Sequence, residues 1–198
     1  QPSRGVRLGY IHATARRTTN AEIVALKVAS NNDKMSQLIN EVQFLLNLHH
    51  DGIVGAYGIY AVKTEDRKSL GMLLEHKKGG DLSSWIPTGG LPEPMVRGIA
   101  AQICDALVYL HGIPVVHRDI KPSNVLCERR EDGSVKVVLA DFGLASSVTD
   151  IENMSRRCGT GGFIAPEMFC RTWTEGFHKE SITNITKIDA FSFGMLIY

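Results

Sequence analysis

The pattern of apolar and polar residues divides the chain into a strand-like part followed by a helical part. The runs 6–13, 22–29, 53–62 and 69–76 are short, partly β-branched and separated by polar stretches, which predicts strands. Between the second and third runs, apolar residues from 34 to 48 recur at helical spacing, which predicts an amphipathic helix. We therefore expect a β-rich unit with one helix in residues 1–76.

The pattern changes at residues 77–80, Lys-Lys-Gly-Gly, where paired glycines beside lysines predict an exposed link between two domains. Residues 81–86 then predict a short helix, and 92–111 predict a long helix with one apolar face. Residues 125–139 predict two strands around an Asp-Gly turn. The expected fold is α+β, with a β-rich domain at 1–76, a hinge at 77–80 and a mainly helical domain at 81–198.

Composition narrows the class of protein only moderately. The chain has 198 residues, of which 43% are hydrophobic and 22% charged, with a formal charge of +1. These values are typical of a folded domain and give no reason to expect a nucleic-acid partner. No run approaches the roughly 18 apolar residues of a membrane span. The four cysteines have no metal-ligand spacing, so we expect reduced thiols in an intracellular, cytoplasmic protein.

Two polar motifs carry the candidate chemistry. Residues 117–124 read His-Arg-Asp-Ile-Lys-Pro-Ser-Asn, and residues 141–143 read Asp-Phe-Gly. Together they place two carboxylates, an amide and a lysine on loops beside the predicted hairpin. Phosphoryl transfer needs a carboxylate to take the proton of the nucleophile, oxygen ligands for Mg²⁺ and a cation near the phosphate.

In this order and spacing, the motifs resemble the signature of eukaryotic-type serine/threonine protein kinases. The resemblance implies a bilobal kinase fold that uses ATP and Mg²⁺. Asp119 is then the catalytic base, and Lys121 steadies the transferred phosphate. Asn124 and Asp141 are the metal ligands, and Asp141 thereby also contacts the nucleotide. A further segment, 189–194, resembles the start of a buried central helix whose aspartate braces the catalytic loop.

The resemblance extends to the first domain. Residues 24–27, Val-Ala-Leu-Lys, are similar to the motif whose lysine holds the α- and β-phosphates of ATP, here Lys27. A lysine between apolar neighbours in a strand needs a charge partner, and Glu41 on the predicted helix is the natural one. Both residues are expected to belong to the catalytic machinery.

The same resemblance implies the adenine and ribose contacts. The backbone around Glu75 and Lys77 is expected to hydrogen-bond adenine, Asp81 to approach the ribose, and Ala25 and Leu126 to sandwich the purine. Asp81 is equally suited to begin the predicted short helix as a cap.

The glycine-rich loop departs from the family pattern. Gly5 occupies the first glycine position and Arg7 the second, while the third falls on Tyr10 unless the loop uses Gly9. Glycines let the backbone approach the phosphates, so this departure predicts weakened or reshaped nucleotide binding.

Residues 159–167 resemble the kinase loop that binds protein substrates and ends in Ala-Pro-Glu. Lys121 and Thr160 together favour serine or threonine as the acceptor. Arg118 resembles the arginine that pairs with a phosphate on the activation segment of many kinases. Thr149 and Ser155 are then the candidate phosphate carriers.

The last residues fall inside the central helix, so the resemblance implies a domain truncated at its C-terminus, with apolar surface exposed on that helix. The leading hypothesis is ATP- and Mg²⁺-dependent phosphorylation of serine or threonine in protein substrates. A nucleotide-binding pseudokinase that acts as a scaffold is the alternative, based on the departing glycine loop. A small-molecule kinase is a third hypothesis, disfavoured by the substrate loop. The oligomeric state stays open.

Overall fold

The computed structural model describes residues 5–7, 10–16, 23–63, 68–169 and 185–198. By its internal contacts the chain groups into two compact units, one of residues 1–49 with 54–77 and one of residues 50–53 with 78–198. The first holds a β-sheet and a helix, and the second is mainly helical, which confirms the predicted α+β class. Within the described ranges, no helix combines the length and the apolar character needed to cross a membrane.

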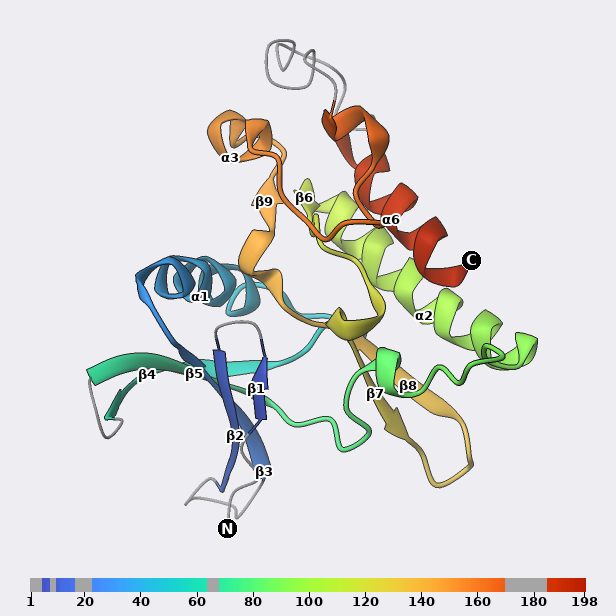
Figure 1. Cartoon of the computed structure of the whole chain (residues 1–198), viewed down its shortest axis with the longest axis horizontal. Helices are drawn as coiled ribbons and strands as arrows, with labels where there is room; N and C mark the ends of the chain where they lie inside the picture. Colours follow the sequence, from blue (N-terminus) through green and yellow to red (C-terminus); the bar gives the residue numbers. More distant parts are fainter. Residues whose placement is uncertain (1–4, 8–9, 17–22, 64–67, 170–184) are drawn as a thin grey trace. The chain divides into compact units, whose positions relative to one another are not determined.

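The first unit contains a five-stranded antiparallel sheet with the strand order β1-β2-β3-β5-β4 (Figure 1). One strand prediction is wrong, because the run 6–13 is not a single strand. It is divided between β1 and β2, which pair with Arg7 opposite Tyr10. A glycine inside a strand pattern often marks such a break, although Gly9 itself lies outside the described residues. The strands are β1 Gly5–Arg7, β2 Tyr10–Arg16, β3 Ile23–Ala29, β4 Ala56–Lys63 and β5 Lys68–Glu75.

The helix of the first unit, α1 (Asn32–Leu45), begins two residues earlier than the sequence pattern predicts. The side chain of Asn31 accepts a hydrogen bond from the amide of Lys34 at 2.8 Å and so caps the helix. Two apolar residues of the predicted stripe, Ile39 and Leu46, are exposed because they lie at its edges. The buried face consists of Leu38, Glu41, Val42 and Leu45.

In the second unit, the helices α2 (Glu93–Gly112) and α6 (Lys187–Ile197) pack against each other (Figure 1). The bounds of α2 agree with its prediction to within one residue. Gln102 on α2 accepts a hydrogen bond from the amide of Val137 at 3.0 Å and donates one to the carbonyl of Val135 at 2.9 Å. This side chain therefore ties α2 to the edge of strand β8 (Val135–Leu139).

Strands β7 (Val125–Arg129) and β8 (Val135–Leu139) form the predicted hairpin, with a left-handed glycine, Gly133, in its turn. At the other end of the hairpin, the amide of Ala140 donates to the carbonyl of Asn124 at 2.9 Å. The hairpin therefore brings the end of one motif beside the start of the other.

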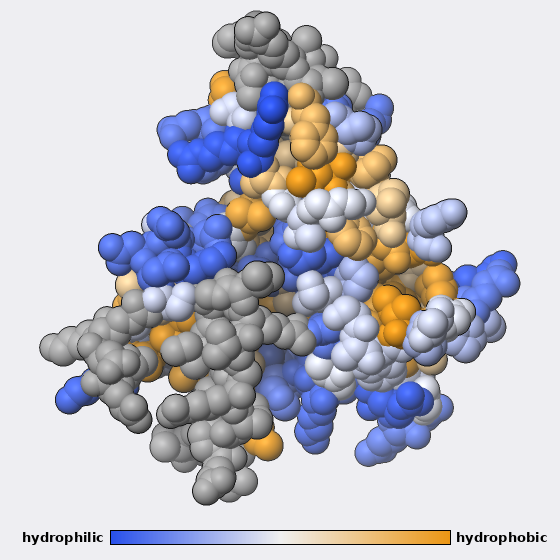
Figure 2. Space-filling view, viewed as in Figure 1, coloured by the Kyte–Doolittle hydropathy of each residue, from blue (hydrophilic) through white to orange (hydrophobic). Residues whose placement is uncertain are grey.

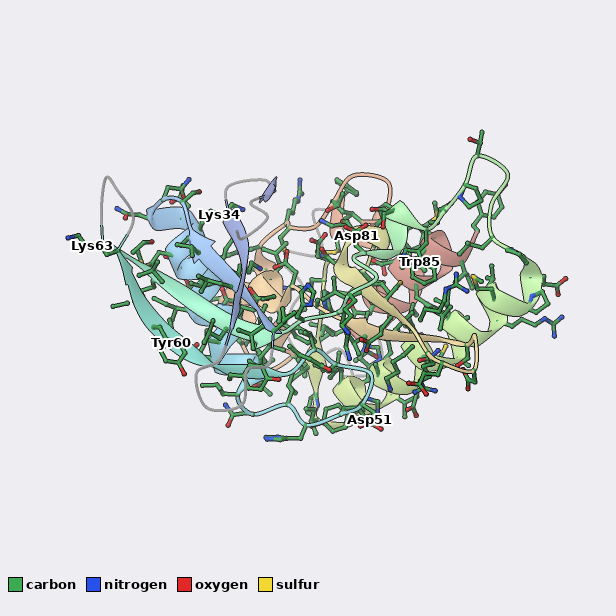
Figure 3. All side chains as sticks on the ribbon, turned by 90° about the horizontal axis from the view of Figure 1, so that it is seen from below. Lys34, Asp51, Tyr60, Lys63, Asp81 and Trp85 are labelled. Atoms are coloured by element: carbon green, nitrogen blue, oxygen red, sulfur yellow. The ribbon has the colours of Figure 1, made fainter. Side chains whose placement is uncertain are left out.

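Short elements complete the second unit. The predicted helix at 81–86 is a single 3-10 turn, η1, flanked by Asp81 and Trp85 (Figure 3). Asp81 caps the start of the turn, and Trp85 follows its end. The elements are η1 Leu82–Ser84, β6 Val115–Val116, η2 Pro122–Asn124, η3 Phe142–Leu144, β9 Ser146–Ser147, α3 Ile151–Ser155 and η4 Pro166–Phe169.

Helix α6 is apolar around most of its circumference. Ile188 is buried in a core cluster, whereas Phe191, Met195 and Ile197 reach the surface, which confirms the predicted exposure. Figure 2 shows apolar surface in this region of the second unit. The core cluster consists of Val116, Val148, Met154, Ala165, Met168, Ile185 and Ile188.

Candidate active site

The carboxylate of Asp119 is part of a small ring of hydrogen bonds with Lys121 and Thr160, and Asn124 also binds it. Its Oδ2 accepts from Lys121 Nζ at 2.7 Å and from Asn124 Nδ2 at 2.9 Å. Its Oδ1 accepts from Thr160 Oγ1 at 2.7 Å, and Lys121 also donates to Thr160 Oγ1 at 2.6 Å. Asp119 is only 7% exposed. The ring therefore fixes one orientation of a buried carboxylate and places a cation beside it.

The backbone of the same loop is held by Asp189 on α6. The Oδ2 atom of Asp189 accepts from the amide of His117 at 2.8 Å, and Oδ1 accepts from the amide of Arg118 at 2.9 Å. Arg118 has a φ of +65°, a conformation that side chains rarely adopt without such support. The structure thus confirms the predicted brace. It adds His111, whose Nε2 lies 3.0 Å from Asp189 Oδ2 and which the sequence pattern assigned only to the end of a helix.

Asn124 and Asp141 lie at neighbouring positions of the hairpin base. Asn124 Nδ2 donates to both the carbonyl and the Oδ2 atom of Asp119, each at 2.9 Å. Since the amide hydrogens point at Asp119, only the amide oxygen of Asn124 can serve as a ligand to a cation. Asp141 follows Ala140, which is bonded to the Asn124 backbone, and has a φ of +64°.

These oxygens fit a bound Mg²⁺ ion, which takes one or two protein carboxylates together with phosphate oxygens and water. Within the part of the chain that the structure describes, no three His, Cys, Asp or Glu side chains form a metal centre of their own. Asn124 and Asp141 as metal ligands stay a prediction.

His117 supports the site by packing. Its ring is fully buried, lies 4.7 Å from the ring of Phe142 in an edge-on arrangement, and has Nε2 3.1 Å from the carbonyl of Ala140. These contacts join the catalytic loop to the backbone that leads into Asp141.

In the first unit, the structure brings the predicted partners Lys27 and Glu41 together. Lys27 Nζ on β3 lies 2.6 Å from Glu41 Oε2 on α1. The two side chains are 4% and 1% exposed. A buried ammonium requires an anion because water no longer compensates its charge. The pair therefore fixes the position of the Lys27 amine beside α1.

The predicted nucleotide contacts of the first unit lie on β1, β3 and the end of β5. Gly5 is in β1, whereas Gly9 falls outside the described residues. Ala25 on β3 is opposite Leu74 on β5. Glu75 ends β5, and its Oε1 lies 2.5 Å from Lys77 Nζ. Their contacts with adenine and the phosphates stay predictions.

In the second unit, Asp81 forms an isolated antiparallel bridge with Leu126 on β7. Asp81 is buried, and its Oδ1 accepts hydrogen bonds from the amide of Ser84 at 3.1 Å and from the hydroxyl of Ser83. This is the capping role that the sequence allowed. The ribose contact of Asp81 and the purine contact of Leu126 stay predictions.

The guanidinium of Arg118 binds main-chain oxygens. Nε donates to the carbonyl of Leu144 at 2.6 Å, and Nη1 donates to the carbonyl of Asn153. Burial lowers the pKa of this guanidinium from its ordinary value. No sequence signal indicated these acceptors.

Comparisons with known proteins agree with this geometry. The family model described as "Protein kinase domain" matches residues 9–198. The chain is 32% identical over 160 residues to serine/threonine-protein kinase DCLK3 of Mus musculus, covering 80% of this chain and 18% of the relative. It is 32% identical over 192 residues to serine/threonine-protein kinase RAD53 of Saccharomyces cerevisiae, covering 95% and 22%. It is also 32% identical over 196 residues to CBL-interacting protein kinase 4 of Oryza sativa, covering 93% and 39%.

The matched region is thus a minor part of each relative, from 18% to 39% of its length. The family model nevertheless covers almost all of this chain, including both motifs and the residues that surround Asp119. The chain belongs to the protein kinase domain family.

Proposed function

We propose that the protein transfers the γ-phosphate of ATP to serine or threonine hydroxyls of protein substrates, with Mg²⁺ as the metal. The observation that carries this proposal is the ring around Asp119, in which Lys121, Asn124 and Thr160 all bind one carboxylate. A carboxylate fixed in this way can orient a substrate hydroxyl and accept its proton.

The other residues of the chain supply positioning and charge. Lys121 Nζ, 2.7 Å from Asp119 Oδ2, places a positive charge where the transferred phosphate would approach the hydroxyl. Mg²⁺, when bound, neutralises phosphate charge, and Asn124 and Asp141 are the residues that would hold it. Lys27, kept in place by Glu41, would bind the α- and β-phosphates.

Two observations support serine and threonine as acceptors. The relatives DCLK3 and RAD53 are named serine/threonine-protein kinases. Within this chain, Thr160 bonds both Lys121 and Asp119, so the start of the substrate loop is tied to the proposed base. A substrate hydroxyl bound beside Asp119 would then lie next to the substrate loop.

The test is a transfer assay with the intact protein, labelled ATP, Mg²⁺ and a peptide library. Replacing Asp119 by Asn should lower kcat by about 100-fold or more, because a positioned base contributes that much, and should leave ATP binding unchanged. The matched control is Asp51→Asn, which alters an exposed carboxylate. ATP binding without transfer by the wild-type protein would support the pseudokinase alternative, whose sequence argument is the departing glycine loop.

A further inference from the structure

The activation segment, Leu144–Arg156, is attached to the catalytic loop at two points. Arg118 donates from Nε to the carbonyl of Leu144 at 2.6 Å and from Nη1 to the carbonyl of Asn153. Its own amide is fixed by Asp189, and the residue is only 8% exposed. A single buried guanidinium therefore holds both the beginning and the later part of the segment.

A buried side chain provides a third attachment. Met154 on α3 has no exposed surface and belongs to the core cluster with Ile188 of α6. The helix that carries it is capped by Asp150, which accepts from the amide of Asn153 at 3.0 Å and from its side-chain nitrogen at 2.6 Å. The segment is therefore packed as part of the second unit.

The candidate phosphate carriers bind elsewhere. Thr149 Oγ1 lies 2.8 Å from Ser147 Oγ, and the Ser155 hydroxyl donates to the carbonyl of Glu152 at 2.8 Å. Arg156, the residue after Ser155, pairs with the carboxylate of Glu152 at 2.8 Å. A phosphate orders a loop when it gives a guanidinium an anion to bind. Here main-chain carbonyls are the acceptors of Arg118.

We propose that this activation segment adopts its ordered conformation through Arg118 and Met154, without a phosphate on Thr149 or Ser155. Arg118 is then a positioning residue, since it connects the segment to the loop that carries Asp119. The ordering follows from contacts within the second unit, and only its consequence for catalysis rests on the proposed function.

The experiment compares hydrogen exchange across residues 144–158 in four forms of the intact protein: untreated, phosphatase-treated, Thr149→Ala/Ser155→Ala and Arg118→Gln. The first three should exchange at rates within about twofold of one another, because their anchors are unchanged. Arg118→Gln should exchange at least about tenfold faster, because two hydrogen bonds to a charged group are lost. Arg156→Gln, which removes only the exposed pair with Glu152, is the matched control and should resemble the untreated protein.

Two results would overturn the proposal. One is tenfold faster exchange after phosphatase treatment or in Thr149→Ala/Ser155→Ala, and the other is unchanged exchange in Arg118→Gln. If Arg118→Gln does not fold, as judged by thermal unfolding, Arg118→Lys takes its place. Lysine keeps the charge but lacks the planar fork that reaches two acceptors, so it should also accelerate exchange.

Kinetics separate a positioning role from a general loss of structure. In Arg118→Gln, kcat should fall at least about tenfold while the KM for ATP changes by less than about twofold, because Arg118 is not among the residues expected to contact the nucleotide. Equal loss of ATP binding and turnover would contradict the positioning role. If no form of the protein transfers phosphate, the proposed function fails, whereas the exchange data still decide whether the segment needs a phosphate.

Discussion

Removing one partner of the Lys27–Glu41 pair leaves the other charge buried in the first unit. The two atoms are 2.6 Å apart, and the side chains are 4% and 1% exposed. Breaking such a pair typically costs about 3–5 kcal/mol of unfolding free energy. At about 2–4 °C per kcal/mol for a domain of this size, Lys27→Met should lower Tm by roughly 6–20 °C. Glu41→Leu should have an effect of similar size.

The double variant Lys27→Met/Glu41→Leu separates the cost of the buried charge from the value of the pair. Both new side chains are apolar and close in size to those they replace, so neither leaves an uncompensated charge. Replacing a buried pair in this way is often neutral or stabilising. We therefore expect the double variant to recover most of the stability lost in each single variant, with a coupling energy of about 3 kcal/mol or more.

Activity should not recover together with stability. If Lys27 binds the nucleotide phosphates, the double variant will fold but neither bind ATP well nor transfer phosphate. The assays are urea unfolding of all four proteins and the labelled-ATP transfer reaction. A single variant that costs less than about 1 kcal/mol, or a double variant as unstable as both single variants combined, would refute the reasoning about burial.

Single residues outside the Lys27–Glu41 pair give three more tests. A Cβ on Gly79 would lie 2.5 Å from the carbonyl oxygen of Cys127, whereas a Cβ on Gly89 would meet open space. In urea unfolding, Gly79→Ala should therefore lower the free energy of unfolding by about 1–3 kcal/mol, and Gly89→Ala by less than about 0.5 kcal/mol. Burial raises the pKa of Cys127 to about 12, so its reactive thiolate is scarce near neutral pH. Alkylation of the folded protein should therefore modify the exposed Cys104 but not the buried Cys127. Equal labelling rates of the two thiols would contradict this. Hydrogen bonds from the backbone and side chain of Asn153 hold the pKa of Asp150 below its ordinary value. The stability that the Asp150 carboxylate contributes is therefore fully present above its ordinary pKa, and it is lost as the pH falls through the lowered pKa. Asp150→Ala should lower Tm by about 2–4 °C near neutral pH, because losing a helix cap costs about 1 kcal/mol. The difference in Tm between the wild-type protein and the variant should become smaller in acid. A difference that does not change with pH would show that the charge of Asp150 has no role.

Local patterns in the sequence were sufficient for most of the elements and for the family. The long helix α2 and the hairpin β7–β8 were predictable because hydrophobic spacing and an Asp-Gly turn act over short distances along the chain. The motifs at 117–124 and 141–143 identified the residues of the candidate site for the same reason. The division of the run 6–13 between β1 and β2 was missed, although a glycine inside a strand pattern is a local signal of such a break.

The α+β class, the family and the set of chemical groups available for phosphoryl transfer could thus be predicted from the residues alone. How those groups are held depends on the tertiary structure. Thr160 binds the carboxylate of Asp119 from a position 41 residues away, and His111 approaches Asp189 across 78 residues. At such separations no periodic pattern links two residues. The acceptors of Arg118 are carbonyl oxygens. Every residue carries a carbonyl, so its use as an anchor leaves no mark on the sequence and depends on the packing of Met154 and the cluster around it.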